Sequence, residues 1–217
     1  MPIITISRGT LSGGRAVAEC LAESLDYPCV GREILQEAAK ALGASEETVR
    51  SKLETPPGRW ALLTQERQRY VVAVQAALAE QAARGNLVYH GLAGQFLLRG
   101  LPGVLRVRLI APLEMRIRAV AAAHHATSQQ AAARFIRNVD RDRKRWVRLM
   151  YGADVTSPSL YDLTINLRAI SLTTTCAIIT ELARQPQYET TEAVRTTLQA
   201  FAAECRERLR AAVSEQP

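Results

Sequence analysis

The first sixteen residues constrain the fold of this chain most. A β-branched run over residues 3–6 predicts a buried strand. A loop with three glycines follows (Gly9, Gly13 and Gly14), and from Ala16 onward apolar residues recur at helical spacing. Glycines let backbone N–H groups converge on an anion because no Cβ blocks its approach, and the N-terminus of the following helix adds its positive end. The stretch therefore predicts a phosphate-binding loop within an α/β fold.

The loop keeps the spacing of the P-loop pattern G-x-x-x-x-G-K-[ST] but changes two of its chemical groups. Arg15 stands where the pattern has lysine, and it keeps a permanent charge for the β- and γ-phosphates as a planar fork. Ala16 removes the hydroxyl that binds Mg²⁺. A bland turn rich in glycine and serine is the alternative, but the position directly after a strand favours phosphate binding. The residues predicted to hold the phosphates are Gly9, Thr10, Leu11, Ser12, Gly13, Gly14, Arg15 and Ala16.

Length and cysteine content limit the class of protein. A chain of 217 residues is long enough for one domain with a sizeable core. The four cysteines are far apart, with neither C-x-x-C nor metal-ligand spacing, which favours buried thiols in a reducing compartment. They are Cys20, Cys29, Cys176 and Cys205. The sequence shows neither a signal peptide nor an apolar run of membrane-spanning length, so we expect a cytoplasmic protein with no membrane partner.

The net charge of +7 is concentrated in one segment. Residues 116–148 contain nine basic residues and only two acidic ones, so this window holds the whole excess and predicts an anionic partner. Four of its cations are spaced four, three and four residues apart, which places them along one stripe of a helix. They are Arg137, Arg141, Lys144 and Arg148. Such a stripe is either a solvated helix face or a set of cations that neutralises a phosphoryl group during its transfer.

Short strand-like segments alternate with helical ones along most of the chain. The expected strands are residues 3–6, 27–30, 86–91, 104–112 and 161–166. Among the helical patterns, the longest early one covers residues 59–84 and the last covers about 191–213. This alternation predicts an α/β fold with a parallel sheet that helices cover on both faces.

The histidines do not suggest a metal site. His124 and His125 are adjacent, so on a helix they point to opposite sides, which favours surface positions. His90 ends an expected strand at the carboxyl edge of the sheet, where ligands bind in open α/β folds. It is a candidate for lining the substrate site, and a core histidine with satisfied hydrogen bonds is the equal alternative. We therefore expect no metal ion held by protein ligands alone.

Four stretches, in this order, resemble the cytidylate kinase-like proteins, a P-loop family related to the nucleoside monophosphate kinases. The first is similar to the family's variant loop, which also has Gly-Gly-Arg, and the second to its segment beside the acceptor pocket. The third stands where a strand ending in Gly-Arg is usual, and the last resembles the Asp-x-x-Arg of the lid and the strand after it. They are residues 5–8 with 12–15, residues 28–35, residues 88–91, and residues 140–143 with 161–166.

This resemblance implies a three-layer P-loop kinase-like fold with about five parallel strands. It also implies a kinase that moves the γ-phosphoryl group of ATP, with Mg²⁺, to a nucleoside monophosphate or a related small acceptor. Residues 1–186 form the kinase-like domain, in which about 36–85 are the acceptor-binding insert and about 116–148 the lid. Residues 187–217 are a helical extension outside the resemblance.

The resemblance also assigns roles to single residues. Arg15 contacts the β and γ oxygens of the donor, and Arg32 meets the phosphate of the acceptor. Arg143 closes over the transferring group with another arginine of the lid, while Asp140 orients these arginines or helps to position Mg²⁺. The residues implied for catalysis are Arg15, Arg143 and Asp140. Those expected to bind substrate are Arg32, His90, Arg137 and Arg141.

Three departures from the family pattern keep a second function open. Leu92 stands where an arginine is usual, Gly31 where an aspartate is common, and Ala16 offers Mg²⁺ no ligand. Leu92 and Ala16 favour a P-loop protein that binds nucleotide without turnover and acts as a sensor. A nucleic-acid-binding module ranks last, because the aromatic content is only 5% and no stacking pattern interleaves the arginines.

The last helix carries an apolar stripe. Its members are Val194, Leu198, Phe201 and Leu209. The stripe favours docking against the core of the same chain over a partner surface, and a homodimer through this helix remains the alternative.

Overall fold

The protein contains one sheet of five parallel strands. The structure, a computed structural model, describes residues 2–54, 65–122 and 128–214. The strand order is β2-β3-β1-β4-β5, so the first strand lies in the centre of the sheet. The strands are β1 (Ile3–Arg8), β2 (Cys29–Val30), β3 (Leu87–Tyr89), β4 (Val104–Ile110) and β5 (Leu163–Asn166). Each predicted strand is therefore present, and each pairing is parallel, as the alternation of strands and helices predicted.

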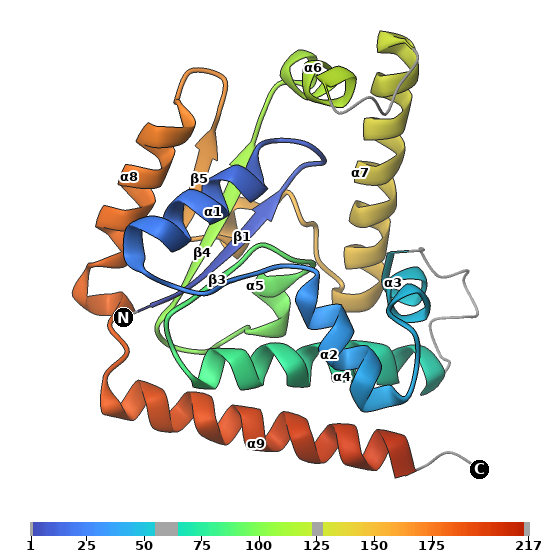
Figure 1. The fold of residues 1–217 in the computed structure, drawn as a ribbon, viewed down its shortest axis with the longest axis vertical. Helices are drawn as coiled ribbons and strands as arrows, with labels where there is room; N and C mark the ends of the chain where they lie inside the picture. Colours follow the sequence, from blue (N-terminus) through green and yellow to red (C-terminus); the bar gives the residue numbers. More distant parts are fainter. Residues whose placement is uncertain (1, 55–64, 123–127, 215–217) are drawn as a thin grey trace.

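Helices cover both faces of this sheet (Figure 1). The helices are α1 (Gly14–Leu25), α2 (Glu33–Leu42), α3 (Glu46–Glu54), α4 (Gln65–Ala83), α5 (Gly94–Leu97), α6 (Leu113–Ala122), α7 (Gln129–Tyr151), α8 (Leu172–Ala183) and α9 (Glu192–Ser214), with short 3₁₀ turns over Pro158–Leu160 and Pro186–Tyr188. Helices α1 and α8 pack together on one face, and α4, α5 and the C-terminal half of α7 cover the other. The fold is thus a three-layer α/β sandwich. Residues 59–64 of the predicted early helix, and His124 and His125, lie outside the described residues.

Strand β1 explains how the layers are held together. Successive side chains of a strand point to opposite faces. Ile4 and Ile6 belong to the apolar cluster under α1 and α8, whereas Ile3 belongs to the cluster under α4 and α5. All three are at most 2% exposed, so the central strand is buried on both faces. Arg8 continues the Ile4 and Ile6 side of the strand, which places its side chain on the face that α1 covers.

The cysteine prediction was wrong for one pair. Cys20 of α1 and Cys176 of α8 are joined by a disulfide with a Cα–Cα distance of 6.3 Å. The two residues are 156 positions apart in the sequence, and only the packing of α1 against α8 brings them together. Cys29 and Cys205 are free thiols, of which Cys205 is buried.

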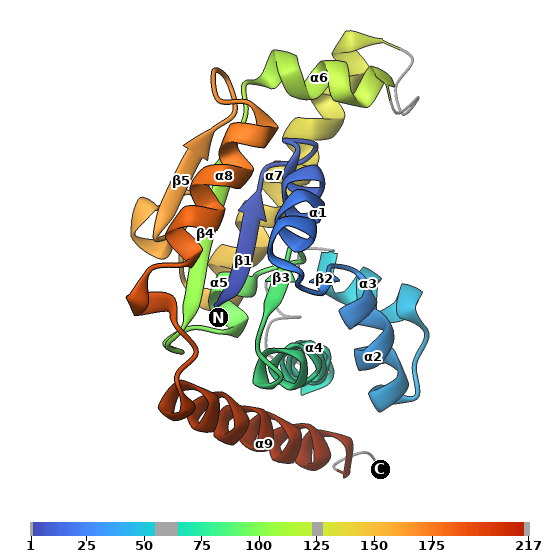
Figure 2. The ribbon, with the colours of Figure 1, turned by 60° about the vertical axis from the view of Figure 1, so that its left-hand side comes forward.

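Helix α9 docks on the rest of the chain. Figures 1 and 2 both show it running alongside α4 at the end of the molecule away from α6. Leu198 is 1% exposed within the apolar cluster of α4, and Val194, Phe201 and Leu209 pack against the same cluster. An ion pair of 2.7 Å between Arg206 and Glu80 adds to this contact. The apolar stripe is therefore part of the core. Among the described helices, none combines the length and the apolar character that crossing a bilayer requires.

Helices α6 and α7 form a pair next to the loop that follows β1. Val120 of α6 packs against Ala132 and Ile136 of α7, and all three are at most 1% exposed. Leu11 of the loop packs against this same cluster. The helix pair and the loop thus share a small apolar core of their own.

Candidate functional site

The loop between β1 and α1 is tightly folded. Gly13 has a φ of 79°, in the left-handed region where glycine carries no penalty for a Cβ, and Leu11 lies in the same region with a φ of 57°. The Ser12 hydroxyl donates to the carbonyl of Gly9 over 2.9 Å, which closes the turn. A positive φ at a leucine costs free energy, and such strain is found mainly at functional sites.

The N-terminus of α1 is not capped. Gly13 occupies the cap position, where no side chain accepts a hydrogen bond from the helix. Within the described residues, the amides of Gly14, Arg15 and Ala16 have no backbone or side-chain acceptor. These donors, at the positive end of a twelve-residue helix and beside glycines, are the groups that bind a phosphate in other helix N-termini.

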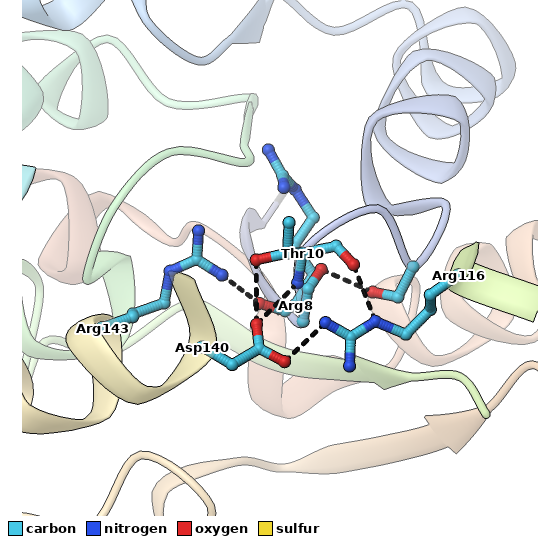
Figure 3. A network of polar contacts seen from close by, with 7 residues as sticks. Arg8, Thr10, Arg116, Asp140 and Arg143 are labelled. Carbon is cyan, nitrogen blue, oxygen red and sulfur yellow. Dashed lines mark hydrogen bonds and ion pairs between the residues drawn. The ribbon is translucent and has the colours of Figure 1, made fainter. Parts of the chain in front are cut away.

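The α6–α7 pair contacts the loop through Thr10. The amide and hydroxyl of Thr10 donate to Oδ1 of Asp140 over 3.0 and 2.8 Å. Arg116 of α6 donates from Nε to the Thr10 carbonyl over 2.7 Å, and its Nη2 donates to Oδ2 of Asp140 over 2.5 Å. Figure 3 shows Asp140 reaching the loop from α7 and Arg116 reaching it from the other side. Both helices therefore form hydrogen bonds with Thr10 of the loop.

The Asp140 carboxylate is held in its charged form. Burial alone raises its pKa, but the hydrogen bonds from Arg116 and Thr10 outweigh burial, so the pKa lies below its usual range. The side chain of Arg116 is only 12% exposed, against 33% for Asp140, so the pair is partly shielded from water.

Arg143 is the second α7 residue at the loop. Its guanidinium donates to the main-chain carbonyl of Arg8, at the end of β1, over 3.0 Å (Figure 3). Asp140 and Arg143 thus lie on the side of α7 that faces the loop. The predicted cationic stripe borders this side, because Arg137 and Lys144 lie three and four residues from Asp140. Its four residues are exposed, and Lys144 pairs with Asp154 over 3.0 Å. Within the described residues, neither Arg137 nor Arg141 forms a hydrogen bond or an ion pair with the loop, and Arg141 lies 3.7 Å from Asp142.

The structure also places Arg15 away from the loop. Its side chain is 78% exposed, and its Nε donates to Glu19 of the same helix over 2.7 Å. Ala16 is exposed as well. Arg15 therefore contributes its amide to the helix terminus, while its guanidinium lies along the surface of α1.

His90 and Arg32 lie at the carboxyl edge of the sheet, where they follow β3 and β2. The ring of His90 lies against Gly31, where a Cβ would come within 2.5 Å of it. Its Nδ1 is buried and has no hydrogen-bond partner within the described residues. Burial and the charge of Arg8 lower the pKa of His90, which favours the neutral imidazole. Arg32, at the start of α2, is exposed.

A cavity that no sequence pattern indicated lies between the start of α6 and the turn after β5. It has a volume of about 420 Å³ and is open to solvent. Its lining residues come from the start of α6 and from the turn after β5. They are Pro112, Glu114, Met115, Arg118 and Arg168. Leu167 of the same turn lies near Gly13 of the loop.

A comparison with protein families identifies the chain. The model of the cytidylate kinase-like family matches residues 3–169. The chain belongs to the cytidylate kinase-like family. The match ends before α8 and α9, and it includes the loop, Arg116, Asp140 and Arg143. None of the curated proteins compared with this chain matches it.

Solved structures confirm the fold of this family member. An uncharacterized protein from Eubacterium ventriosum is 18% identical, with 84% of this chain and 97% of that chain covered and a TM-score of 0.66. A shikimate kinase from Bacteroides thetaiotaomicron is 10% identical, with 85% and 99% covered and a TM-score of 0.51. The three-layer P-loop kinase fold is thus confirmed.

The loop of this cytidylate kinase-like protein fits a metal ion that arrives with a nucleotide. Over the three described ranges, no three cysteine, histidine or acidic side chains gather as metal ligands. Asp140 touches the loop, but both its oxygens already accept hydrogen bonds from Thr10 and Arg116. Mg²⁺ usually keeps several waters and binds through substrate phosphates with few protein ligands. These residues fit that mode of binding.

Proposed function

We propose that the protein is an ATP-dependent phosphotransferase that moves the γ-phosphoryl group to a nucleoside monophosphate or a related small acceptor that carries a phosphate. Family membership supports a kinase-like phosphotransferase. The observation that carries the proposal is the uncapped N-terminus of α1 behind a glycine loop, faced by Arg116 and Arg143. Phosphoryl transfer requires mainly positioning and charge neutralisation, which such an arrangement supplies.

The donor nucleotide has room on one side of the loop. In this proposal Gly9–Ala16 hold its phosphates through backbone amides, and the cavity between α6 and the turn after β5 holds its base. Arg118 and Arg168 line that cavity and offer planar guanidinium groups for stacking on a purine. Mg²⁺ arrives with the phosphates and neutralises their charge.

The acceptor binds at the opposite side of β1. Arg32 meets its phosphate and His90 lines the pocket, with residues 36–85 as the acceptor-binding insert. Residues 116–148 are the lid of the kinase-like domain, which spans 1–186. In this lid Asp140 orients Arg116, and Arg143 reaches over the end of β1. Within the described residues, Arg137 and Arg141 have no contact with the loop, so we propose no role for them in the transfer itself.

A second candidate function is a nucleotide-binding regulatory protein without turnover. Two observations favour it: the guanidinium of Arg15 points away from the loop, and Ala16 has no hydroxyl for Mg²⁺. Neither feature changes the backbone amides at the start of α1 that are proposed to bind the phosphates.

One assay separates the two functions. ADP release is measured with Mg-ATP against a panel of nucleoside monophosphates, with a phosphate-free sugar acid as the control acceptor. The kinase predicts turnover that requires a phosphate-bearing acceptor. Saturable ATP binding without turnover for any acceptor would establish the regulatory protein instead, and absence of ATP binding contradicts both.

The left-handed backbone of Gly13 gives a further prediction. We expect Gly13→Ala to cost about 1 kcal/mol of unfolding free energy, because an L-residue is strained at this φ. Its Cβ would also approach Leu172 to 3.3 Å. The same change should weaken ATP binding at least tenfold, since the loop must shift. Urea unfolding and a fluorescence titration with labelled ATP measure the two effects.

Gly43→Ala is the matched control. Gly43 has a φ of 61° at the end of α2, and a Cβ there would meet nothing within 4 Å. It should cost a similar free energy of unfolding and leave ATP binding unchanged. Equal ATP affinities in the two variants would show that the backbone shape of the loop does not matter for binding.

A further inference from the structure

Arg8 is a cation that the proposed roles leave unused. It is the last residue of β1, and its side chain runs across Gly14, the first residue of α1. The two are so close that a Cβ on Gly14 would overlap the Cδ of Arg8. Its Nε is fully enclosed and has no hydrogen-bond partner within the described residues. Within residues 2–54, 65–122 and 128–214, Arg8 forms no ion pair with a carboxylate.

Other cations surround Arg8. Burial, and then the charges of Arg143 and Arg32, lower the pKa of its guanidinium. Arg8 in turn acts on His90, whose Nδ1 is also buried and lacks a hydrogen-bond partner in the described ranges. Burying the Nε donor of a cation without a partner costs free energy, and neighbouring cations add repulsion. A bound anion would remove both costs.

The position of Arg8 indicates which anion fits. On one side lie the uncapped amides of α1, which seat the donor phosphates in the proposed function. On the other lie Arg32 and His90, on the acceptor side. Arg143 approaches the same point from α7 and donates to the Arg8 carbonyl. The guanidinium is therefore near both the proposed donor loop and the residues proposed for the acceptor side.

We propose that Arg8 is a direct phosphate ligand that, together with Arg143, binds the terminal phosphoryl group of the donor at the point where it meets the acceptor. This inference rests on the proposed function for the identity of the donor. Because the guanidinium of Arg15 points along α1, Arg8 supplies the side-chain cation at the mouth of the loop.

The test compares two nucleotides that differ by one phosphate. Wild type and Arg8→Met are titrated calorimetrically with ADP and with a non-hydrolysable ATP analogue, both with Mg²⁺. We expect Arg8→Met to weaken binding of the ATP analogue roughly ten- to a hundredfold, because charge-assisted hydrogen bonds are lost. Binding of ADP should weaken less than about threefold. Arg145→Met, which removes an exposed cation from α7 that no predicted role uses, should change neither affinity. Equal losses for both nucleotides, or no loss, would overturn the proposal.

Thermal unfolding gives a readout that does not depend on the nucleotide. In phosphate-free buffer, Arg8→Met should melt at or above the wild-type temperature, because it removes an unpaired enclosed charge. Tripolyphosphate should raise the melting temperature of wild type but not of Arg8→Met. If tripolyphosphate acts through Arg8 while ATP does not bind, the phosphate site stands and the kinase function fails. A variant that melts several degrees lower without any anion would assign Arg8 a purely structural role and contradict the proposal.

Discussion

Arg143→Ala is expected to lower the turnover of phosphoryl transfer by roughly a hundred- to a thousandfold, with little change in the affinity for ADP. Arg143 reaches the end of β1 from α7, and its Nη1 donates to the Arg8 carbonyl over 3.0 Å. In the proposed function, this position is close to the place where charge develops on the moving phosphoryl group. Single-turnover measurements with Mg-ATP and the best acceptor of the panel separate this step from product release.

Arg141→Ala is the control for the same helix. Arg141 is exposed, and its nearest carboxylate is Asp142 at 3.7 Å, so its removal should leave turnover within about twofold. If Arg141→Ala and Arg143→Ala slow turnover equally, the exposed cationic stripe acts on the reaction and the assignment of Arg143 is wrong.

Asp140→Asn should reduce the free energy of unfolding by about 2 kcal/mol at pH 7. The amide of the variant can accept a hydrogen bond but cannot neutralise Arg116, which is only 12% exposed. Removing one partner of a fully buried ion pair lowers the free energy of unfolding by more than this. Here a third of the Asp140 side chain is in contact with water, which makes the loss smaller. Urea unfolding measures the difference, and Asp142→Asn, which touches an exposed arginine, should stay within about 0.5 kcal/mol of wild type.

The pH dependence of this difference tests its cause. Because the folded protein lowers the pKa of Asp140, the contribution is fully present above the unfolded value of about 3.9 and is lost as the pH falls through the lower folded value. The gap between wild type and Asp140→Asn should therefore stay constant from pH 7 to about pH 4.5 and shrink below that. A gap that closes between pH 7 and about pH 5 would point to a group other than this carboxylate.

The fold was readable from the sequence because local patterns agree with one another. Ile3–Ile6 are β-branched and buried on both faces, as a central parallel strand requires, and Ser171 caps α8 through the amide of Thr174, as a serine before a helical pattern predicts. Each of these signals lies within a few residues of chain. The Cys20–Cys176 disulfide has no such signal, since it depends on how two helices pack, and the prediction of thiols at these two positions was wrong.

The site was only partly readable for the same reason. The glycine spacing identified the loop, and the Asp-x-x-Arg sequence of 140–143 identified the α7 residues that face it. The side-chain direction of Arg15 is set by Glu19 one turn later, and the contact of Arg116 with Thr10 joins residues 106 positions apart. The stripe of Arg137 and Arg141 has the regular spacing of a helix face, but spacing does not tell which face meets the loop.

The most direct test of the central claim is a crystal structure of the protein with Mg²⁺ and a non-hydrolysable ATP analogue. The account predicts phosphate oxygens within about 3.2 Å of the amide nitrogens of Gly14, Arg15 and Ala16. A nucleotide bound elsewhere, with these three amides facing solvent, would contradict it.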